Sequence, residues 1–412
     1  MYVYHCQPWL FGITVLVFLT LTPFKLSAEP ALARALSLHE AVEAAWARNP
    51  AARASAARRE ELTARRKAAN GLFPAPPSVS FSHRSDQPYN GQGQREYEAE
   101  LSLPLWMPGA RKTTRATAQA ELGRFDAKLV LAKLKLAGEV RDAYWQVRLA
   151  ANERDLAHRR ADEAIVLAGD VARRVKSGDL ARASLNQARG LEHQARATAL
   201  AAEARATRAL RLFTVLTGFT RLPDKAEEEA ARVYLLEAHP LLNAHRRTLE
   251  AARAKLKQTT TIKRDHPELI LGAGRSRDDT RDPYGDTVHV GVRFPLSTQA
   301  RNRPLIAAAS ADLEEAEATL AQETDRVAAE IDAVRAGLEL AKQVEQLASE
   351  RLRLAIDTHK LYAKAFRLGE VDLQTRLRAE NERFDAELAL TRARLDAGRA
   401  IASLNQSYGL VP

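Results

Sequence analysis

Two long stretches of the chain contain no proline, and this feature limits the possible folds more than any other. Residues 109–222 and 305–411 lack proline entirely, and a proline inside a helix costs about 3 kcal/mol. Apolar residues recur at helical spacing within the first stretch, at Phe125, Leu129, Ala132, Leu136 and Val140. We therefore predict one helix over 109–176 and another over 304–366, each roughly 95–100 Å long at about 1.5 Å per residue.

Each predicted long helix ends at a glycine that marks a turn. Gly178 stands in VKSGDL and Gly369 in FRLGEV, and a glycine just after a basic last turn signals a helix C-terminus. An acidic residue comes next in both cases, Asp179 and Glu370, which suits the positive end of a new helix. The sequence therefore predicts two helical hairpins.

The remaining helices are shorter. The returning helices of the hairpins are expected over 180–213 and up to about Ser407, and two further helices over 38–70 and 233–260. A capping box beginning at Ser37 marks the start of the first. One short helix and one returning helix together match the length of one long helix, so we expect them to lie end to end alongside it.

The same order of features occurs twice along the chain. The matching pairs at an offset of 191 positions include Pro104 with Pro295, Gly178 with Gly369, Gly218 with Gly409, and Glu139 with Glu330. Two further pairs match at an offset of 190, Pro50 with Pro240 and Pro77 with Pro267. One insertion or deletion explains the slip. We therefore expect two repeats of similar architecture, over 29–223 and 224–412.

Four segments alternate between apolar and polar residues, as strands do. They span 78–84, 96–105, 268–275 and 287–296, and the turn-rich connections 85–95 and 276–286 join them into two hairpins. One face of the second and fourth segments is apolar, with Tyr97, Ala99, Leu101, Leu103, Val288, Val290, Val292 and Phe294. The other face carries Glu96, Glu98, Glu100, Ser102, Thr287, His289, Gly291 and Arg293. Such segments are typical of membrane-spanning strands around a wet lumen.

The first 28 residues have the pattern of a secretory signal peptide. An apolar run precedes a small-residue cleavage pattern that ends at Ala28, and a retained membrane anchor is the alternative. The single cysteine, Cys6, lies in this segment, so the exported chain would have no disulfide and no thiolate metal site. The formal charge is +10. Because export argues against nucleic acid as a partner, we attribute the excess of Lys and Arg to solvated helical faces.

Together these features resemble the TolC family of outer-membrane efflux proteins. The likeness covers nearly all of the chain after residue 28 and is most specific in AFRLGEVDLQTRLRAENERFDAELAL (365–390), which is similar to the CzcC/CusC-like heavy-metal efflux branch. The segment LSLHEAVEAAWARNP (36–50) also resembles the first helix of the family. The resemblance implies a mainly α-helical fold with a small membrane β-barrel. Four strands are too few to close a barrel, since about eight is the minimum, whereas a homotrimer supplies twelve.

The resemblance also implies a function. The chain would be a passive outer-membrane duct of a tripartite efflux system, with a helical tunnel in the periplasm. Its partners would be a periplasmic adaptor (membrane-fusion) protein, an inner-membrane resistance-nodulation-division pump and outer-membrane lipid, and its cargo heavy-metal cations. Multidrug efflux and type I secretion are alternatives for the cargo. A periplasmic coiled-coil adaptor is an alternative for the whole chain, but it gives no reason for four amphipathic strands.

Roles for particular residues follow from the same resemblance. The adaptor-docking tips are Lys176, Ser177, Gly178, Asp179, Arg367, Leu368 and Gly369, and the periplasmic entrance holds Glu370, Asp372, Thr375 and Arg378. Some family members have constricting aspartates where this chain has Thr375 and Arg378. We therefore expect Glu370 and Asp372 to supply the negative charge, and Arg378 to pair with a carboxylate such as Glu382.

The strands contribute the remaining candidate residues. The barrel lumen would contain Glu96, Glu98, Glu100, His289 and Arg293. We expect the three glutamates to keep the lumen wet rather than to bind cations. Tyr97 and Trp106 are candidate membrane-interface anchors, with ordinary packing as the alternative.

Other chemistry finds little support in the sequence. GAGRSRD (272–278) contains a Gly-x-Gly, but a strand hairpin rather than a helix is expected after it. His39 and Glu40 lack the second histidine of a zincin motif, and the other histidines are scattered. We therefore expect no dedicated metal cage and no cofactor. No nucleophile–base pair stands out, so an enzyme is not expected.

Overall fold

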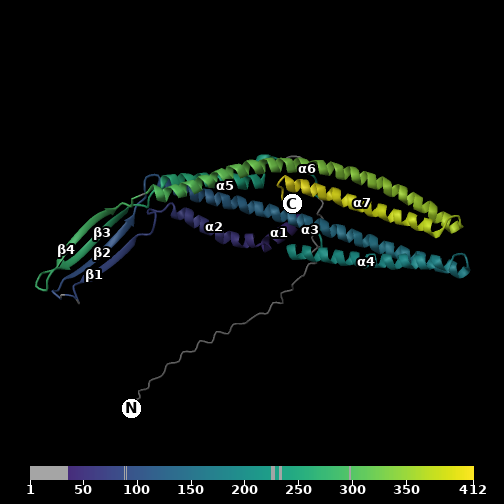
Figure 1. The fold of residues 1–412 in the computed structure, drawn as a ribbon, viewed down its shortest axis with the longest axis horizontal. Helices are drawn as coiled ribbons and strands as arrows, with labels where there is room; N and C mark the ends of the chain where they lie inside the picture. The colour runs from purple at the N-terminus through teal and green to yellow at the C-terminus, as the bar shows by residue number, and fades with distance from the viewer. Residues whose placement is uncertain (1–35, 88, 90, 224–227, 232–233, 297) are drawn as a thin grey trace, which may run out of the picture. The chain divides into compact units, whose positions relative to one another are not determined.

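The computed structural model describes residues 36–87, 89, 91–223, 228–231, 234–296 and 298–412 (Figure 1). The expected signal peptide lies outside these residues. The helices are α1 (Leu38–Arg48), α2 (Pro50–Ala68), α3 (Ala110–Ser177), α4 (Arg182–Thr217), α5 (Pro240–Thr261), α6 (Gln299–Leu368) and α7 (Leu373–Ser407), with a 3-10 turn at Leu236–Ala238. The strands are β1 (Ser78–Ser85), β2 (Arg95–Pro104), β3 (Glu268–Arg277) and β4 (Gly285–Arg293). The fold is mainly helical with one small sheet, as the sequence predicts.

The long helices α3 and α6 set the arrangement of the other elements. They have 68 and 70 residues, which corresponds to roughly 100 Å each at about 1.5 Å per residue. α2 and α4 pack along α3, while α5 and α7 pack along α6 (Figure 1). This is the end-to-end placement that the helix lengths predict. α3 also contacts α5 and α7, which joins the two halves of the chain.

The four strands form one antiparallel sheet in the order β1-β2-β3-β4. Leu101 of β2 lies opposite Val79 of β1 and Leu271 of β3, and Leu271 lies opposite Val290 of β4. Side chains in one such row point to the same face, so the alternation seen in the sequence becomes a continuous apolar face. The sheet lies at one end of α3 and α6, and the turns that lead into α4 and α7 lie at the other (Figure 1).

Two strands end earlier than predicted. β2 stops at Pro104 rather than at 105, and β4 stops at Arg293 rather than at 296. The register explains both, because Glu268, the first residue of β3, pairs with Pro104 and with Arg293. Just beyond this row lie Pro267 and Pro295, which have no N–H to donate to a strand ladder.

The prediction that the second long helix begins at Pro304 is wrong, because α6 begins at Gln299 and contains that proline. Thr298 caps the helix by accepting the backbone N–H of Arg301 at 3.4 Å. The guanidinium of Arg301 donates to both carboxylate oxygens of Asp265, at 2.8 and 2.7 Å. Pro304 removes one intrahelical hydrogen bond. The helix does not end there, because these contacts fix its first turn.

The helix predicted over 38–70 is divided at Asn49. A residue before proline is restricted to extended backbone, and Asn49, which precedes Pro50, has φ −68° and ψ 132°. Its side chain accepts the backbone N–H two residues further on at 2.9 Å and so starts α2. Pro240 opens α5 in the same way, so the helix expected over 233–260 starts there instead.

Two apolar cores hold the helices together along the middle of α3 and α6. The first joins α1, α3 and the end of α4, and it contains Val42, Val140, Tyr144 and Phe213. The second joins α5, α6 and the end of α7, and it contains Leu242, Ile331, Leu338, Leu404 and Tyr408. Between these cores and the turns, α3 and α4 pack through Ala157, Ala161, Ala164, Ala195, Ala199 and Ala202. In the described part of the chain, no helix has an apolar run long enough to cross a membrane.

His239 links the second core to the start of α5, and its burial predicts that stability depends on pH. It is 6% exposed, and its Nδ1 accepts the N–H of Leu241 at 3.2 Å. Burial lowers the pKa of His239, although its hydrogen bond to the backbone carbonyl of Ser407 and the charge of Glu330 oppose the shift. The folded protein therefore favours the neutral imidazole, and the unfolded chain takes up a proton first as the pH falls.

We expect the folded protein to lose stability as the pH falls through about 6.5, the ordinary pKa of histidine, because the unfolded state then binds more protons. His239→Asn keeps a good helix cap and should remove this part of the pH dependence. The measurement is the apparent Tm of both proteins between about pH 8 and pH 5. Parallel curves across that range would contradict the assignment to His239.

Candidate functional site

The turn between α3 and α4 and the turn between α6 and α7 are built alike. Gly178 and Gly369 have φ angles of 88° and 79°, a left-handed backbone that glycine adopts at no steric cost. The N–H groups of Asp179 and Glu370 each donate to the carbonyl five residues earlier, at 2.9 and 3.0 Å, which closes the helix ends. The turns predicted at the two glycines are therefore present.

The residues expected to dock an adaptor are exposed at these turns. They are Lys176, Ser177, Gly178, Asp179, Arg367, Leu368 and Gly369. The side chain of Leu368 is 64% exposed, so the tip offers an apolar contact as well as charges. Ser177 Oγ donates to Asp179 Oδ2 at 2.8 Å and orders the first turn.

Phe366, which the sequence analysis did not single out, holds the two turns together. It is 2% exposed, and the guanidinium groups of Arg174 and Arg376 lie 4.9 and 5.1 Å from its ring centroid. Val171 and Leu373 belong to the same buried cluster. Cations over an aromatic ring are attracted to its face, so residues from α3, α6 and α7 converge on one side chain. The two hairpin tips therefore form one packed unit.

The expected entrance residues begin α7. Asp372 is its N-cap and accepts the N–H of Thr375 at 2.9 Å. Hydrogen bonds from Thr375, together with the charge of Arg378, hold the pKa of Asp372 below its ordinary value. Asp372 is therefore ionised at neutral pH, and Glu370 is exposed two residues before it.

The expected partner of Arg378 is engaged elsewhere. Glu382 accepts two hydrogen bonds from Arg351 of α6, at 3.2 and 2.7 Å. Within the helical hairpin, α6 and α7 pack side by side, so a cross-helix arginine reaches Glu382. The charge of Arg378 acts on Asp372 instead.

The two hairpins meet along a polar seam between α3 and α7. Its ion pairs are Arg392 with Glu153 at 2.6 Å, Arg159 with Glu387 at 2.6 Å, Arg399 with Asp142 at 2.9 Å, and Arg383 with Glu163. Glu380 of α7 is buried at this seam, and burial raises its pKa against the opposing charge of Arg376. The two hairpins are therefore joined by these ion pairs along α3 and α7 and by the apolar cluster around Phe366 at their tips.

The predicted lumen residues lie on one face of the sheet. Glu96 pairs with Arg84 at 2.9 Å, and Arg293 pairs with Glu268 at 3.1 Å. On the same face, carboxylate oxygens of Glu98 and Glu100 lie 3.7 and 3.3 Å from Nε2 of His289. The opposite face is apolar and open, since Val79, Phe81, Val288 and Val290 are 76%, 73%, 82% and 69% exposed. A contiguous exposed apolar surface of this kind is unusual on a soluble monomer.

Tyr97 and Trp106 lie at opposite ends of this sheet. Tyr97 is near the loop end and stacks on His83 at a centroid distance of 4.5 Å. Trp106 follows β2 at the helical end, where its indole N–H donates to Gly71 O at 3.1 Å and its ring meets His266 edge-on at 5.2 Å. Trp106 thus packs the junction of sheet and helices. A role of either residue at a membrane interface stays a proposal.

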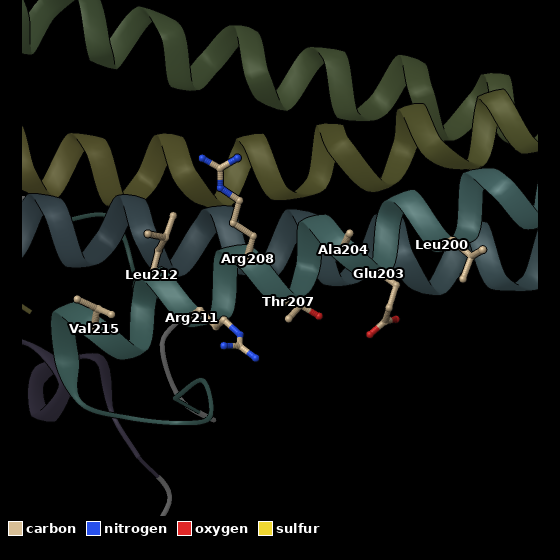
Figure 2. Close-up of a pocket in the computed structure, with 8 residues that line it drawn as sticks. All are labelled: Leu200, Glu203, Ala204, Thr207, Arg208, Arg211, Leu212 and Val215. Atoms are coloured by element: carbon tan, nitrogen blue, oxygen red, sulfur yellow. The ribbon is translucent and has the colours of Figure 1, made fainter.

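α4 and α6 each carry an apolar stripe that faces away from their packing partners. On α4 the stripe is formed by Leu200, Ala204, Leu212 and Val215, and the polar residues Glu203, Thr207, Arg208 and Arg211 line the same shallow groove (Figure 2). On α6 the exposed apolar residues are Leu340, Val344, Leu347, Leu354 and Leu361. Both sets follow the i, i+4, i+7 spacing of one helix face. These residues were not predicted from the sequence, because each helix has a second apolar face that packs inside the hairpin.

The amphipathic sheet and the two long hairpins match the fold of several solved outer-membrane proteins. CusC, whose crystal structures concern transmembrane channel formation, matches with a TM-score of 0.76 and 15% identity over 90% of this chain and 92% of its own. The outer membrane protein VceC from Vibrio cholerae matches with a TM-score of 0.72 and 16% identity over 90% and 96% of the two chains. The MtrE outer membrane channel of Neisseria gonorrhoeae, in its open state, matches with a TM-score of 0.71 and 16% identity over 90% of this chain and 88% of the MtrE chain.

These likenesses concern the fold. No protein-family model matches the sequence, and no curated protein resembles it in sequence. Since the solved structures share less than a fifth of their residues with this chain, its function has to be argued from its own surfaces.

Proposed function

We propose that this chain is the protomer of a homotrimeric outer-membrane duct of the TolC family that passively conducts substrate out of the cell. The observation that carries the proposal is the open apolar face of a sheet joined to helices roughly 100 Å long. Such a sheet needs lipid on one side, and the helices are far longer than a membrane is thick. One repeat would span 29–223 and the other 224–412, each giving one strand hairpin and one helical hairpin.

Closure of the barrel requires more than one copy. The sheet order β1-β2-β3-β4 leaves β1 and β4 as edges, and a bilayer tolerates no open edge. β4 of one protomer would pair with β1 of the next, and three protomers give a closed barrel of a size known for membrane proteins. Strands of 8 to 10 residues rise about 3.4 Å per residue, which suits the hydrocarbon core of roughly 30 Å.

The helices support the same closure. The stripe on α4 and the stripe on α6 lie on opposite sides of the α3–α7 seam, because α4 packs on α3 and α6 packs on α7. A contact between two different surfaces repeats around a ring. The α4 stripe of one protomer would therefore pack on the α6 stripe of the next and complete a helical tunnel.

The tips would form the periplasmic end. They lie at the far end of the helices from the sheet (Figure 1), and their exposed residues from Lys176 to Asp179 and from Arg367 to Gly369 would dock a periplasmic adaptor coupled to an inner-membrane resistance-nodulation-division pump. Heavy-metal cations are the cargo that the sequence resemblance favours. Deletion in the native host, scored against panels of metals and of drugs, decides between this cargo and a drug.

The duct itself is tested by reconstitution. We expect the purified chain to form a trimer that resists mild heating in detergent and to give single-channel conductance in planar bilayers. A monodisperse monomer without conductance would contradict the proposal and would favour a periplasmic adaptor instead.

The entrance carboxylates are tested in the same recordings. We expect the double variant Glu370→Gln with Asp372→Asn to lose most cation selectivity and block by divalent ions, because rings of carboxylates select cations. Asparagine is as good an N-cap as aspartate, so the start of α7 is preserved. Selectivity at the wild-type level would remove these residues from the mechanism.

A further inference from the structure

Three side chains with metal-binding groups converge on the polar face of the sheet. Glu98 and Glu100 come from β2, and His289 comes from β4. The His289 Nε2 lies 3.7 Å from Glu98 Oε1 and 3.3 Å from Glu100 Oε1. One ligand atom of each residue lies within 4.8 Å of the other two. A single ion placed among them can contact all three.

A glycine of β3, Gly272, makes this meeting possible. β3 lies between β2 and β4, and Gly272 stands in one row with Glu100 and His289. A Cβ at Gly272 would lie 2.1 Å from His289 Cε1 and 2.3 Å from His289 Nε2. The imidazole therefore lies across the bare backbone of β3 and reaches the carboxylates two strands away. Glycine weakens a strand interior and often marks a close approach of this kind.

The neighbouring charges suggest more than an ion pair. Elsewhere on this face the carboxylates have arginine partners, Glu96 with Arg84 and Glu268 with Arg293. Glu98 and Glu100 instead point at one imidazole, and a second carboxylate beside the first is repulsive unless a cation joins them.

From this geometry we infer that Glu98, Glu100 and His289 bind a divalent first-row transition metal ion such as Zn²⁺. Imidazole with carboxylates is a donor set for zinc and its neighbours, whereas Mg²⁺ and Ca²⁺ prefer oxygen ligands alone. Three protein ligands leave one position of a tetrahedral site for water. The three side chains are 35%, 34% and 42% exposed, so an ion can enter and leave from solvent.

The position of the site gives it a role in transport. On the proposed function, on which this step rests, the polar face of the sheet lines the lumen, and a trimer carries three such sites around the axis. The ions would then pause at the barrel wall on their way out. Binding itself requires only the folded sheet.

The test is calorimetric titration of the purified full-length protein in detergent with Zn²⁺ alone. We expect His289→Ala to weaken zinc binding by about 10-fold to 100-fold, as loss of a ligand or of its support does in other sites. Gly272→Ala keeps all three ligands and should have a similar effect, because the new Cβ displaces the ring. Gly291→Ala is the matched control on the same face, since the nearest atom to its Cβ is Ile270 Cβ at 4.0 Å.

A second measurement identifies the ligand. Pulsed electron paramagnetic resonance with Cu²⁺ should show imidazole nitrogen coupling that is lost in His289→Ala and kept in His83→Ala, because His83 stacks on Tyr97. Circular dichroism and size-exclusion profiles confirm that each variant is folded. Zinc binding that Gly272→Ala leaves unchanged would overturn the inference. Conductance without zinc binding would contradict the metal site and leave the proposed duct standing. Zinc binding without conductance would contradict the duct and leave the metal site standing.

Discussion

Val290→Arg is expected to prevent assembly in the outer membrane, whereas Thr287→Arg is expected to leave assembly near the wild-type level. Val290 is 69% exposed on the apolar face and stands in the same row as Leu271 and Leu101. In the proposed barrel it faces lipid, where an arginine near mid-bilayer costs about 2–4 kcal/mol per copy. Thr287 lies in the same strand on the polar face, where a charge meets water.

The measurement is the amount of heat-resistant trimer in isolated outer membranes. Both variants add the same side chain to β4, so a difference between them reports which face meets lipid. Equal behaviour of the two would mean that the apolar face is not the lipid face, and the barrel would have to be abandoned.

The second large effect concerns Arg141, whose side chain is 4% exposed in the middle of α3. Its guanidinium binds both carboxylate oxygens of Glu228, at 2.7 and 3.0 Å, and donates to Leu410 O at 3.0 Å. It also donates to the side chain of Gln406. One arginine thus ties α3 to the segment at Glu228 and to the C-terminal residues of the chain.

We expect Arg141→Met to lower the free energy of unfolding by about 3–5 kcal/mol, because removing one partner of a buried ion pair leaves the other charge uncompensated. Adding Glu228→Gln removes that charge and should recover part of the loss. Denaturant or thermal unfolding measures both.

The control is Arg399→Met, which breaks the pair with Asp142 beside Arg141. The side chains of Arg399 and Asp142 are 51% and 59% exposed, so the expected loss of unfolding free energy is at most about 1 kcal/mol. If Arg141→Met costs no more than Arg399→Met, the buried pair does not hold the C-terminal residues in place.

The sequence predicted those features that depend on local chemistry. The turns at Gly178 and Gly369 follow from glycine itself, and the strands follow from alternation. The start of α6 was missed because it depends on a distant contact, the pairing of Arg301 with Asp265. Without that contact, Pro304 is a reasonable place to begin a helix.

The candidate site was predictable only in part, for a similar reason. Alternation places Glu98, Glu100 and His289 on a common face, but their meeting depends on the register of three strands and on Gly272. Likewise Phe366 joins three helices, and Glu382 finds Arg351 across a helix pair. Each of these contacts depends on tertiary packing, which residue types and their spacing do not specify.

The open edges of β1 and β4 bear on how such a protein reaches the membrane. A lone protomer brings unpaired backbone N–H and C=O groups along both edges, and these groups cannot be left bare in hydrocarbon. For the proposed trimeric barrel, single copies therefore cannot insert first and associate later in the bilayer, so three copies would have to meet before or during insertion. The rate of this assembly would then rise steeply with the concentration of newly exported chain. Before three copies associate, exposed strands such as β4 can aggregate edge to edge. The yield of this protein should therefore fall at an early stage of any shortage of periplasmic holding chaperones.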